Sequence, residues 1–242
     1  MSYIFREHIK QSLAVIVFLI TLTACTSESY DAGDGPNSYL TADLVLLHTS
    51  QDKSVRSALL DDGTTLQFSN PFAQDWLTRP DSVYRALLYY DKTVAASDAA
   101  VSNPTATSIV RARSVRPVSV LRPVEAEDMK TLRTDPVGFE SLWMSKNKSY
   151  INLSLLLKSG KTEADDALHA LGIVSHGTTT DADRRRTLHL TLYHDQGGVP
   201  AYYTVQQYVS IPTQLLEEAD TVELTLNTYN GKKVVKVAVS NL

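Results

Sequence analysis

The sequence predicts an all-β protein of two domains, and three observations support this prediction. Apolar side chains recur with a period of two along most of the chain, which is typical of strands whose two faces differ. Asp62-Gly63 and Asn230-Gly231 each lie between two extended runs and predict hairpin turns. A charged stretch bounded by Pro123 and Pro136 interrupts the pattern and marks the boundary between the domains.

The first 25 residues indicate export and attachment of lipid. The apolar run from Leu13 to Leu22 is about half the length that spans a bilayer as a helix, and basic residues precede it, so residues 1–24 are predicted to be a signal peptide. The sequence Leu22-Thr23-Ala24-Cys25 resembles the lipobox of bacterial lipoproteins, in which the cysteine is acylated after cleavage. Cys25 is the only cysteine and has no disulfide partner, so we expect it to carry fatty acids such as palmitate.

Lipid on Cys25 implies a location in the cell envelope, which we expect to be the outer membrane. Residues 25–38 are polar and acidic and contain Gly33, Gly35 and Pro36, which predicts a flexible tether. Cleavage would leave residues 25–242 and, by removing Arg6, Glu7 and Lys10, would change the formal net charge from −4 to −5. An acidic chain argues against nucleic acid as a partner, because nucleic-acid binders present a basic surface.

The N-terminal domain is predicted over residues 39–122. If Asp62-Gly63 forms a two-residue turn, Leu59 faces Leu66 and Ser57 faces Phe68. Residues 93–107 are small and polar and are expected to form a long loop. The domain contains as many strand candidates as an OB-type barrel needs, although the count also allows a second small sandwich. The candidates are 41–49, 54–60, 64–68, 83–91 and 107–115.

The C-terminal domain is predicted over residues 137–242, after a linker at 123–136. With Asn230-Gly231 as the turn, the last hairpin pairs Leu226 with Val235, Leu224 with Val237 and Val222 with Val239, which places all three apolar pairs on one face. Short helical segments are expected at 125–132 and 213–220. Short strands separated by turns predict a β-sandwich. The other strand candidates are 149–160, 167–177, 186–195 and 201–211.

Taken together, these parts resemble a known family. A lipobox, a short acidic tether, a first β domain with LLDDGTTL at 59–66 and a second β domain that ends in a hairpin resemble the NigD-like lipoproteins. The resemblance implies an OB-type barrel followed by a β-sandwich. It also implies a role as an immunity protein in a bacteriocin gene cluster, for which the founding member was named. The family has no catalytic signature, so no functional residue can be transferred.

Histidines and acidic residues are the candidate metal ligands in the sequence. A zinc site needs three or four converging ligands, but His189 and His194 are five residues apart on one strand and therefore point to opposite faces. The acidic pairs lack the interspersed ligand pattern of a calcium loop. The sequence therefore predicts no metal and no cofactor. The candidate ligands are His176, His189, His194, Asp165, Asp166, Asp181, Asp183 and Asp195.

No pattern in the sequence predicts catalysis. There is no G-x-S-x-G motif, and Ser175-His176 are neighbours whose side chains face opposite ways in a strand. The paired carboxylates have simpler roles: Asp61-Asp62 in a turn, Asp165-Asp166 in a solvated loop and Glu217-Glu218 on the exposed face of a short helix. We therefore expect no enzymatic activity.

Two groups of side chains are candidates for binding. The first combines arginines with aromatic rings, as in proteins that bind single-stranded nucleic acid, but the acidic chain favours solvent-exposed arginines instead, including the run 184–186. The second places tyrosines and glutamines along one strand, as at protein interfaces and carbohydrate platforms, although half-buried tyrosines are also common in sandwiches. The first group is Arg111, Arg113, Arg116, Arg122, Tyr84, Tyr89 and Tyr90; the second is Tyr202, Tyr203, Tyr208, Gln206 and Gln207.

The function expected from the sequence is binding. We expect a lipid-anchored protein of the cell envelope that binds a protein or peptide partner, in keeping with the resemblance to immunity lipoproteins. The alternative is an accessory lipoprotein that binds surface glycans through an aromatic strand face.

Overall fold

The computed structural model describes residues 40–92, 108–161, 168–216 and 218–239. Cys25, the predicted tether, the predicted loop at 93–107, Asp165-Asp166 and Glu217 lie outside these ranges. No helix within the described ranges is long and apolar enough to cross a membrane. The structure is nearly all-β, as the sequence predicts.

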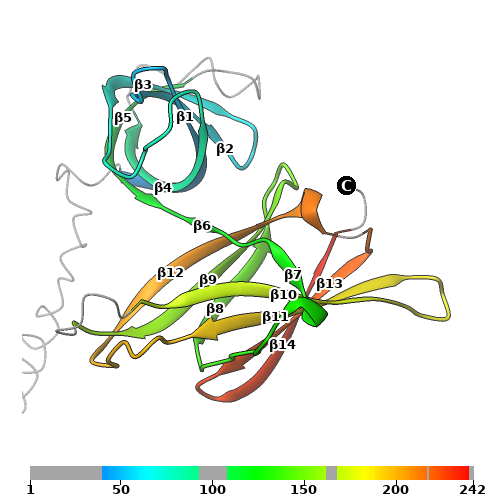
Figure 1. The fold of residues 1–242 in the computed structure, drawn as a ribbon. Helices are drawn as coiled ribbons and strands as arrows, with labels where there is room; N and C mark the ends of the chain where they lie inside the picture. Colours follow the sequence, from blue (N-terminus) through cyan, green and yellow to red (C-terminus); the bar gives the residue numbers. More distant parts are fainter. Residues whose placement is uncertain (1–39, 93–107, 162–167, 217, 240–242) are drawn as a thin grey trace, which may run out of the picture. The chain divides into compact units, whose positions relative to one another are not determined.

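The N-terminal part is a closed five-stranded barrel, which confirms the predicted barrel and excludes a small sandwich (Figure 1). Its strands follow the order β1-β2-β3-β5-β4, with β4 pairing back to β1. Alternate residues such as Val45, Leu47, Ala86 and Leu88 fill the interior. The strands are β1 (Leu40–Thr49), β2 (Val55–Leu60), β3 (Thr65–Phe72), β4 (Val83–Lys92) and β5 (Ser108–Pro117), close to the five predicted ranges.

The C-terminal part is a β-sandwich of two sheets (Figure 1). One sheet has the order β14-β13-β11-β10-β7, and the other has the order β6-β12-β9-β8. Leucine, isoleucine and valine side chains from the inner faces form one buried core, including Leu153, Leu190 and Leu224. The main strands are β8 (Gly138–Met144), β9 (Tyr150–Ser159), β10 (Ala170–Thr180), β11 (Arg186–Asp195), β12 (Tyr203–Pro212), β13 (Thr221–Thr228) and β14 (Gly231–Ala238).

Two short strands between the domains belong to the sandwich sheets. β6 (Ser119–Val120) pairs in parallel with β12, and β7 (Pro123–Glu125) pairs in parallel with β10. The segment predicted as a linker therefore contributes an edge strand. Where short helices were predicted, the structure has single 3-10 turns at Ala126–Asp128 and Thr213–Leu215.

The predicted register of the first hairpin is wrong by one residue. Ala58 lies opposite Leu66, and both are buried in the barrel, whereas Leu59 lies opposite Thr65. The loop has three residues instead of two, because the N–H of Gly63 donates to the carbonyl of Leu60 and Gly63 takes a φ of +90°. This is a type I turn followed by a left-handed glycine, which is the usual three-residue hairpin loop.

The last hairpin is also shifted, by two residues. Leu224 pairs with Val235 and Thr228 pairs with Gly231, so Leu226 lies opposite Lys233. A type I′ turn needs a positive φ at both central residues, but here only Gly231 has one, at +102°. A shift of two keeps the same side chains on the core face, so the predicted apolar face is confirmed although the pairs are not.

Candidate functional site

Arg85 of β4 points out of the barrel and is buried by residues of the sandwich. Its side chain is 1% exposed, and its guanidinium donates to both carboxylate oxygens of Asp61 at 2.5 and 2.7 Å. It also donates to Asn152 Oδ1 at 3.0 Å and to Ser210 Oγ at 3.1 Å. The guanidinium carbon lies 4.3 Å from the centroid of the Tyr150 ring. We call these five residues the clamp.

The clamp satisfies its polar groups internally. Asn152 Nδ2 donates to Asp61 Oδ2 at 3.1 Å, and Ser210 Oγ donates to Asn152 Oδ1 at 2.7 Å. The carbonyl of Asp61 accepts a hydrogen bond from the main-chain N–H of Asn147 at 2.7 Å. A buried charge is tolerated only when it is paired and hydrogen-bonded, so the clamp ties the β2–β3 loop and β4 to the sandwich.

An apolar contact continues from the clamp. Leu44 of β1 and Leu87 of β4 are partners in the barrel register, and both are buried although neither belongs to the barrel interior. They cluster with Val118, which follows β5. Three aromatic side chains, Tyr89, Trp143 and Tyr208, pack against this cluster. The outward side of β4 at Arg85 and Leu87 is therefore covered by residues of the sandwich.

Trp143 and Tyr208 form an edge-to-face pair on the outward face of the four-stranded sheet. Their ring centroids are 6.4 Å apart and their planes meet at 83°. Trp143 lies opposite Asn152, and Tyr208 lies opposite Ser154, so the two rings stand on either side of β9. Both rings are half-buried.

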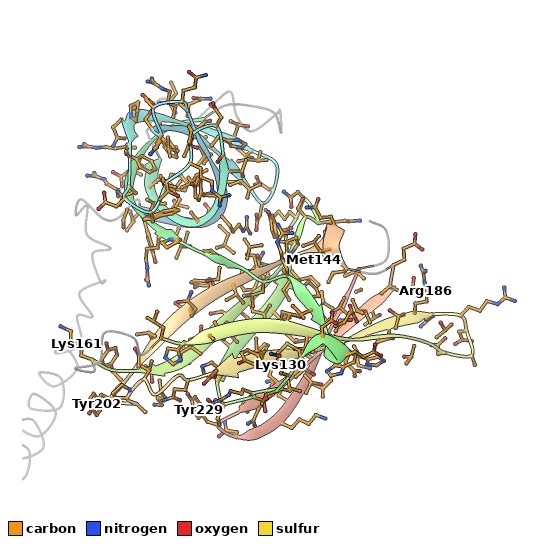
Figure 2. All side chains as sticks on the ribbon, in the orientation of Figure 1. Lys130, Met144, Lys161, Arg186, Tyr202 and Tyr229 are labelled. Atoms are coloured by element: carbon orange, nitrogen blue, oxygen red, sulfur yellow. The ribbon has the colours of Figure 1, made fainter. Side chains whose placement is uncertain are left out.

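A cavity of about 440 Å³ opens beside this aromatic pair. Its volume falls in the range of about 300–1,000 Å³ that is typical of ligand pockets. The barrel contributes Asp43, Asp62 and Tyr89, among others, and the sandwich contributes the rest. From the sandwich come Glu140, Ser141, Trp143, Met144, Ser145, Lys146, Ser154, Gln206 and Tyr208; Met144, at the end of β8, is labelled in Figure 2.

Glu140 is held in a fixed position at this cavity. A bulge in β8 between Phe139 and Ser141 changes the register there and leaves the Glu140 side chain exposed. Its Oε2 accepts hydrogen bonds from Ser154 Oγ at 2.6 Å and from Gln206 Nε2 at 2.5 Å. These bonds, first from Ser154 and then from Gln206, hold the pKa of the Glu140 carboxyl below its usual range.

The cavity is acidic. Asp43, Asp62 and Glu140 line it against a single cation, Lys146, among the lining residues, while the charge of Asp61 is matched by Arg85. Asp43 Oδ2 accepts a hydrogen bond from Tyr90 at 2.8 Å. Burial, followed by this hydrogen bond and then the Asp43 charge, raises the pKa of Tyr90, which stays protonated. The pocket therefore combines aromatic walls with an excess of negative charge.

The structure separates the histidines. His189 lies between Thr179 and Glu223, 3.1 Å from the Glu223 carboxylate, and His176 contacts Thr191. His194 is 1% exposed and its ring stacks on His169, which confirms that His189 and His194 point to opposite faces. No group of three or more metal-ligating side chains occurs in the described part of the chain.

The other candidates are also dispersed. Arg113 pairs with Asp91, and Tyr84 packs edge-on against Trp76. Tyr90 is 2% exposed, so among the three tyrosines of the first group only Tyr89 lines the pocket. Arg111, Arg116 and Arg122 are exposed. Glu218 pairs with Arg186, and Asp181 and Asp183 lie in the exposed β10–β11 turn.

The second binding group is divided between two places. Gln206 and Tyr208 reach the pocket, but Tyr202 and Tyr203 are 78% and 49% exposed at the far end of β12, where Figure 2 labels Tyr202. Gln207 alternates with Gln206 and Tyr208 and so faces the other way.

Sequence reasoning missed Arg85, Glu140 and Trp143. One signal was available: ALLYY at 86–90 is apolar on both alternating faces, which indicates that the outer face of this barrel strand is covered. Glu140 could not have been found, because its position depends on a bulge that the sequence does not reveal.

A closed barrel joined to a two-sheet sandwich, with a pocket lined by both, defines the class of the protein as a two-domain all-β protein. Residues 120–239 match the profile of the NigD-like C-terminal beta sandwich domain, which confirms the predicted family: this domain of the chain belongs to it. No curated protein matches the chain.

Solved structures share the fold. A NigD-like immunity protein from Bacteroides caccae is 21% identical with a TM-score of 0.59, covering 81% of this chain and 91% of that chain. A candidate toxin-related protein from Parabacteroides distasonis is 20% identical with a TM-score of 0.53, and the match covers 82% of this chain and 92% of that chain. A candidate lipoprotein from Bacteroides fragilis is 14% identical with a TM-score of 0.57, and the match covers 83% of this chain and 98% of that chain. At these identities the likeness concerns the fold alone.

Proposed function

We propose that this protein is a lipid-anchored component of the cell envelope that binds a protein or peptide partner in the pocket between barrel and sandwich and catalyses no reaction. One observation carries the proposal: the 440 Å³ cavity has an edge-to-face aromatic pair on one wall and an oriented carboxylate, Glu140, beside it. Half-buried aromatic rings with oriented polar groups are the usual anchors of protein recognition.

Site-specific crosslinking tests partner binding. Ser141 is exposed at the pocket, so Ser141→p-benzoylphenylalanine places a photoreactive group there. Irradiation of intact cells is expected to give a discrete crosslinked product. The matched control is Val234→p-benzoylphenylalanine on β14, where Val234 is 46% exposed. Equal products from both positions, or none from Ser141, would contradict recognition in the pocket.

The lipid anchor is supported by the sequence Leu22-Thr23-Ala24-Cys25 and by the fold that the chain shares with a candidate lipoprotein from Bacteroides fragilis. Two or three acyl chains give lasting attachment, because each buried CH₂ contributes about 0.8 kcal/mol. Metabolic labelling with a palmitate analogue should mark the wild type and not Cys25→Ser. Fractionation should then place the protein in the outer membrane; recovery of Cys25→Ser from the same membrane fraction would oppose the anchor.

Immunity is the role that we propose for partner binding, because the chain shares its fold with a NigD-like immunity protein from Bacteroides caccae. Deletion of the gene should sensitise the producing cells to a toxin made alongside it. Unchanged survival against every co-produced toxin would remove immunity and leave partner binding to be decided by the crosslinking experiment.

Glycan binding is the second candidate, and the exposed rings of Tyr202 and Tyr203 favour it. Aromatic rings that are open to solvent can stack on sugar faces. The full chain in detergent should then be retained on a polysaccharide array, and Tyr202→Ala with Tyr203→Ala should abolish the retention. If no polysaccharide retains the wild type, this candidate is excluded.

A further inference from the structure

We infer that the pocket receives a cationic side chain, lysine or arginine, from an extended peptide segment of the partner. This inference rests on the proposed partner binding and adds the chemistry that the pocket selects. Three features carry it: the arrangement of the aromatic rings, the balance of charge along the walls, and the open edge of the strand that supplies the site.

The aromatic rings provide the first argument. Trp143 and Tyr208 are nearly perpendicular, at 83°, so they form two walls rather than one flat platform. The face of an aromatic ring carries negative charge density and attracts a cation within about 6 Å of its centroid. An ammonium or guanidinium group that lies over the face of either ring is attracted in this way.

The charges provide the second argument. Glu140 lies beside the aromatic pair, and both of its hydrogen bonds go to Oε2, so Oε1 takes none from the described residues. Asp43 and Asp62 add negative charge from the barrel side, and Lys146 is the one cation among the lining residues. A cationic group complements this balance, and an anionic group would be repelled.

The strand edge explains why the cation should belong to a peptide. β8, which supplies Glu140 and Trp143, is the outer strand of its sheet and pairs with β9 alone among the strands described. The main-chain groups of Val137, directly before β8, bond to Asn227 and Tyr229. Beyond that point the other edge of β8 pairs with no described strand and can take an added strand, which is a common mode of peptide recognition. An extended segment along β8 would project alternate side chains toward the pocket.

Fluorescence of Trp143 tests the inference directly. The chain has two tryptophans, so Trp76→Phe leaves Trp143 as the only reporter. The full chain carrying this change is titrated with the peptide acetyl-Ala-Ala-Lys-Ala-Ala-amide, with its arginine counterpart, and with the version in which the lysine is acetylated. We expect a change in Trp143 emission, confirmed by calorimetry, and affinity for the cationic peptides at least about tenfold higher than for the acetylated one.

Variants of the pocket sharpen the test. Glu140→Gln removes the charge and Tyr208→Leu removes one wall; each should weaken binding of the lysine peptide about tenfold. Tyr208→Phe keeps the ring and should bind like wild type, which separates loss of the ring from misfolding. Glu218→Gln is the matched control, since this carboxylate is 87% exposed and pairs with Arg186 away from the pocket. Equal affinity for charged and acetylated peptides, or neither heat nor emission change up to millimolar peptide, overturns the inference.

The outcomes separate the two proposals. If Ser141→p-benzoylphenylalanine captures a partner while the lysine and arginine peptides fail to bind, the cationic specificity is wrong and partner binding stands. If the peptides bind as expected while crosslinking in cells gives no product at the pocket, the chemistry of the pocket stands and its use for a cellular partner is rejected.

Discussion

The outward faces of the two sandwich sheets are built by the same alternation of strand residues but have different surroundings. On the five-stranded sheet, Thr179, His189, Glu223 and Lys236 form a continuous polar row across four strands. Each side chain bonds to its neighbour in the row, and the Lys236 side chain is 63% exposed. Lys236, followed by His189, holds the pKa of the Glu223 carboxyl below its usual range.

On the four-stranded sheet, polar residues at equivalent positions are buried. Asn152 is 0% exposed and Ser154 is 2% exposed, although both lie on the outward face of β9. Asn152 belongs to the clamp, and beyond it Tyr208 and Glu140 border a cavity. Similar strand patterns therefore give a solvated surface on one sheet and an interface with a pocket on the other.

The largest effect is expected from Arg85→Met. Removal of the cation leaves the Asp61 carboxylate partly buried without its partner, which should lower the free energy of unfolding by about 3–5 kcal/mol. Urea denaturation followed by circular dichroism measures the change. Arg186→Met is the matched control, because its partner Glu218 is 87% exposed and stays solvated when the cation is removed, so the change should cost less than about 1 kcal/mol. Equal losses would mean that the clamp is no stronger than a surface pair.

Asn152→Ala should have the next largest effect, about 1–3 kcal/mol in the same measurement, because it deprives Arg85 and Ser210 of a buried acceptor. Its effect should not add to that of Arg85→Met, since both residues belong to one network. Additive losses would show that the two residues stabilise the protein independently.

A smaller, pH-dependent effect is expected from His169. Burial, followed by the charge of His194, lowers the pKa of His169, whose Nδ1 lies 3.0 Å from His194 Nε2. The folded state therefore binds the proton less readily than the unfolded chain, whose histidine pKa is about 6.5. This contribution to stability is complete above about pH 6.5 and is lost as the pH falls below it. Urea denaturation between pH 7.5 and 5 should show that the free energy of unfolding falls less steeply with decreasing pH for His169→Gln than for wild type.

A matched histidine separates this effect from general acid sensitivity. His176 is exposed and contacts Thr191, so His176→Gln should retain the wild-type pH dependence. If His176→Gln flattened the curve as much as His169→Gln, the stacked pair with His194 would not be its source.

The smallest effect is expected in the polar row of the five-stranded sheet. Lys236→Met removes an exposed ion pair with Glu223 and should change the free energy of unfolding by less than about 1 kcal/mol. The effect should shrink further in high salt, because exposed charges are screened. A loss as large as that of Asn152→Ala would contradict the contrast drawn between the two sheets.

The sequence predicted more of the fold than of the residues that line the pocket. The period of two in segments such as 83–91 and 186–195 sufficed for the strands, because each buries alternate residues whatever its partners. The predicted register was wrong in both hairpins. Gly63 supplies its left-handed residue to a three-residue loop, and Gly231 lies opposite Thr228 instead of at the centre of a type I′ turn. Of the candidate binding residues, Tyr89, Gln206 and Tyr208 reached the pocket.

By itself the sequence determined the all-β class, the division into two domains and the apolar face of the last hairpin, because alternation and turn residues act over a few neighbouring positions. Only the tertiary structure decided that Arg85 and Asp61 meet Asn152, and that Glu140 comes to lie beside Trp143 and Tyr208. Residues 24 and 91 positions from Asp61 bond to it. Such contacts depend on barrel closure and strand order, which no local pattern encodes.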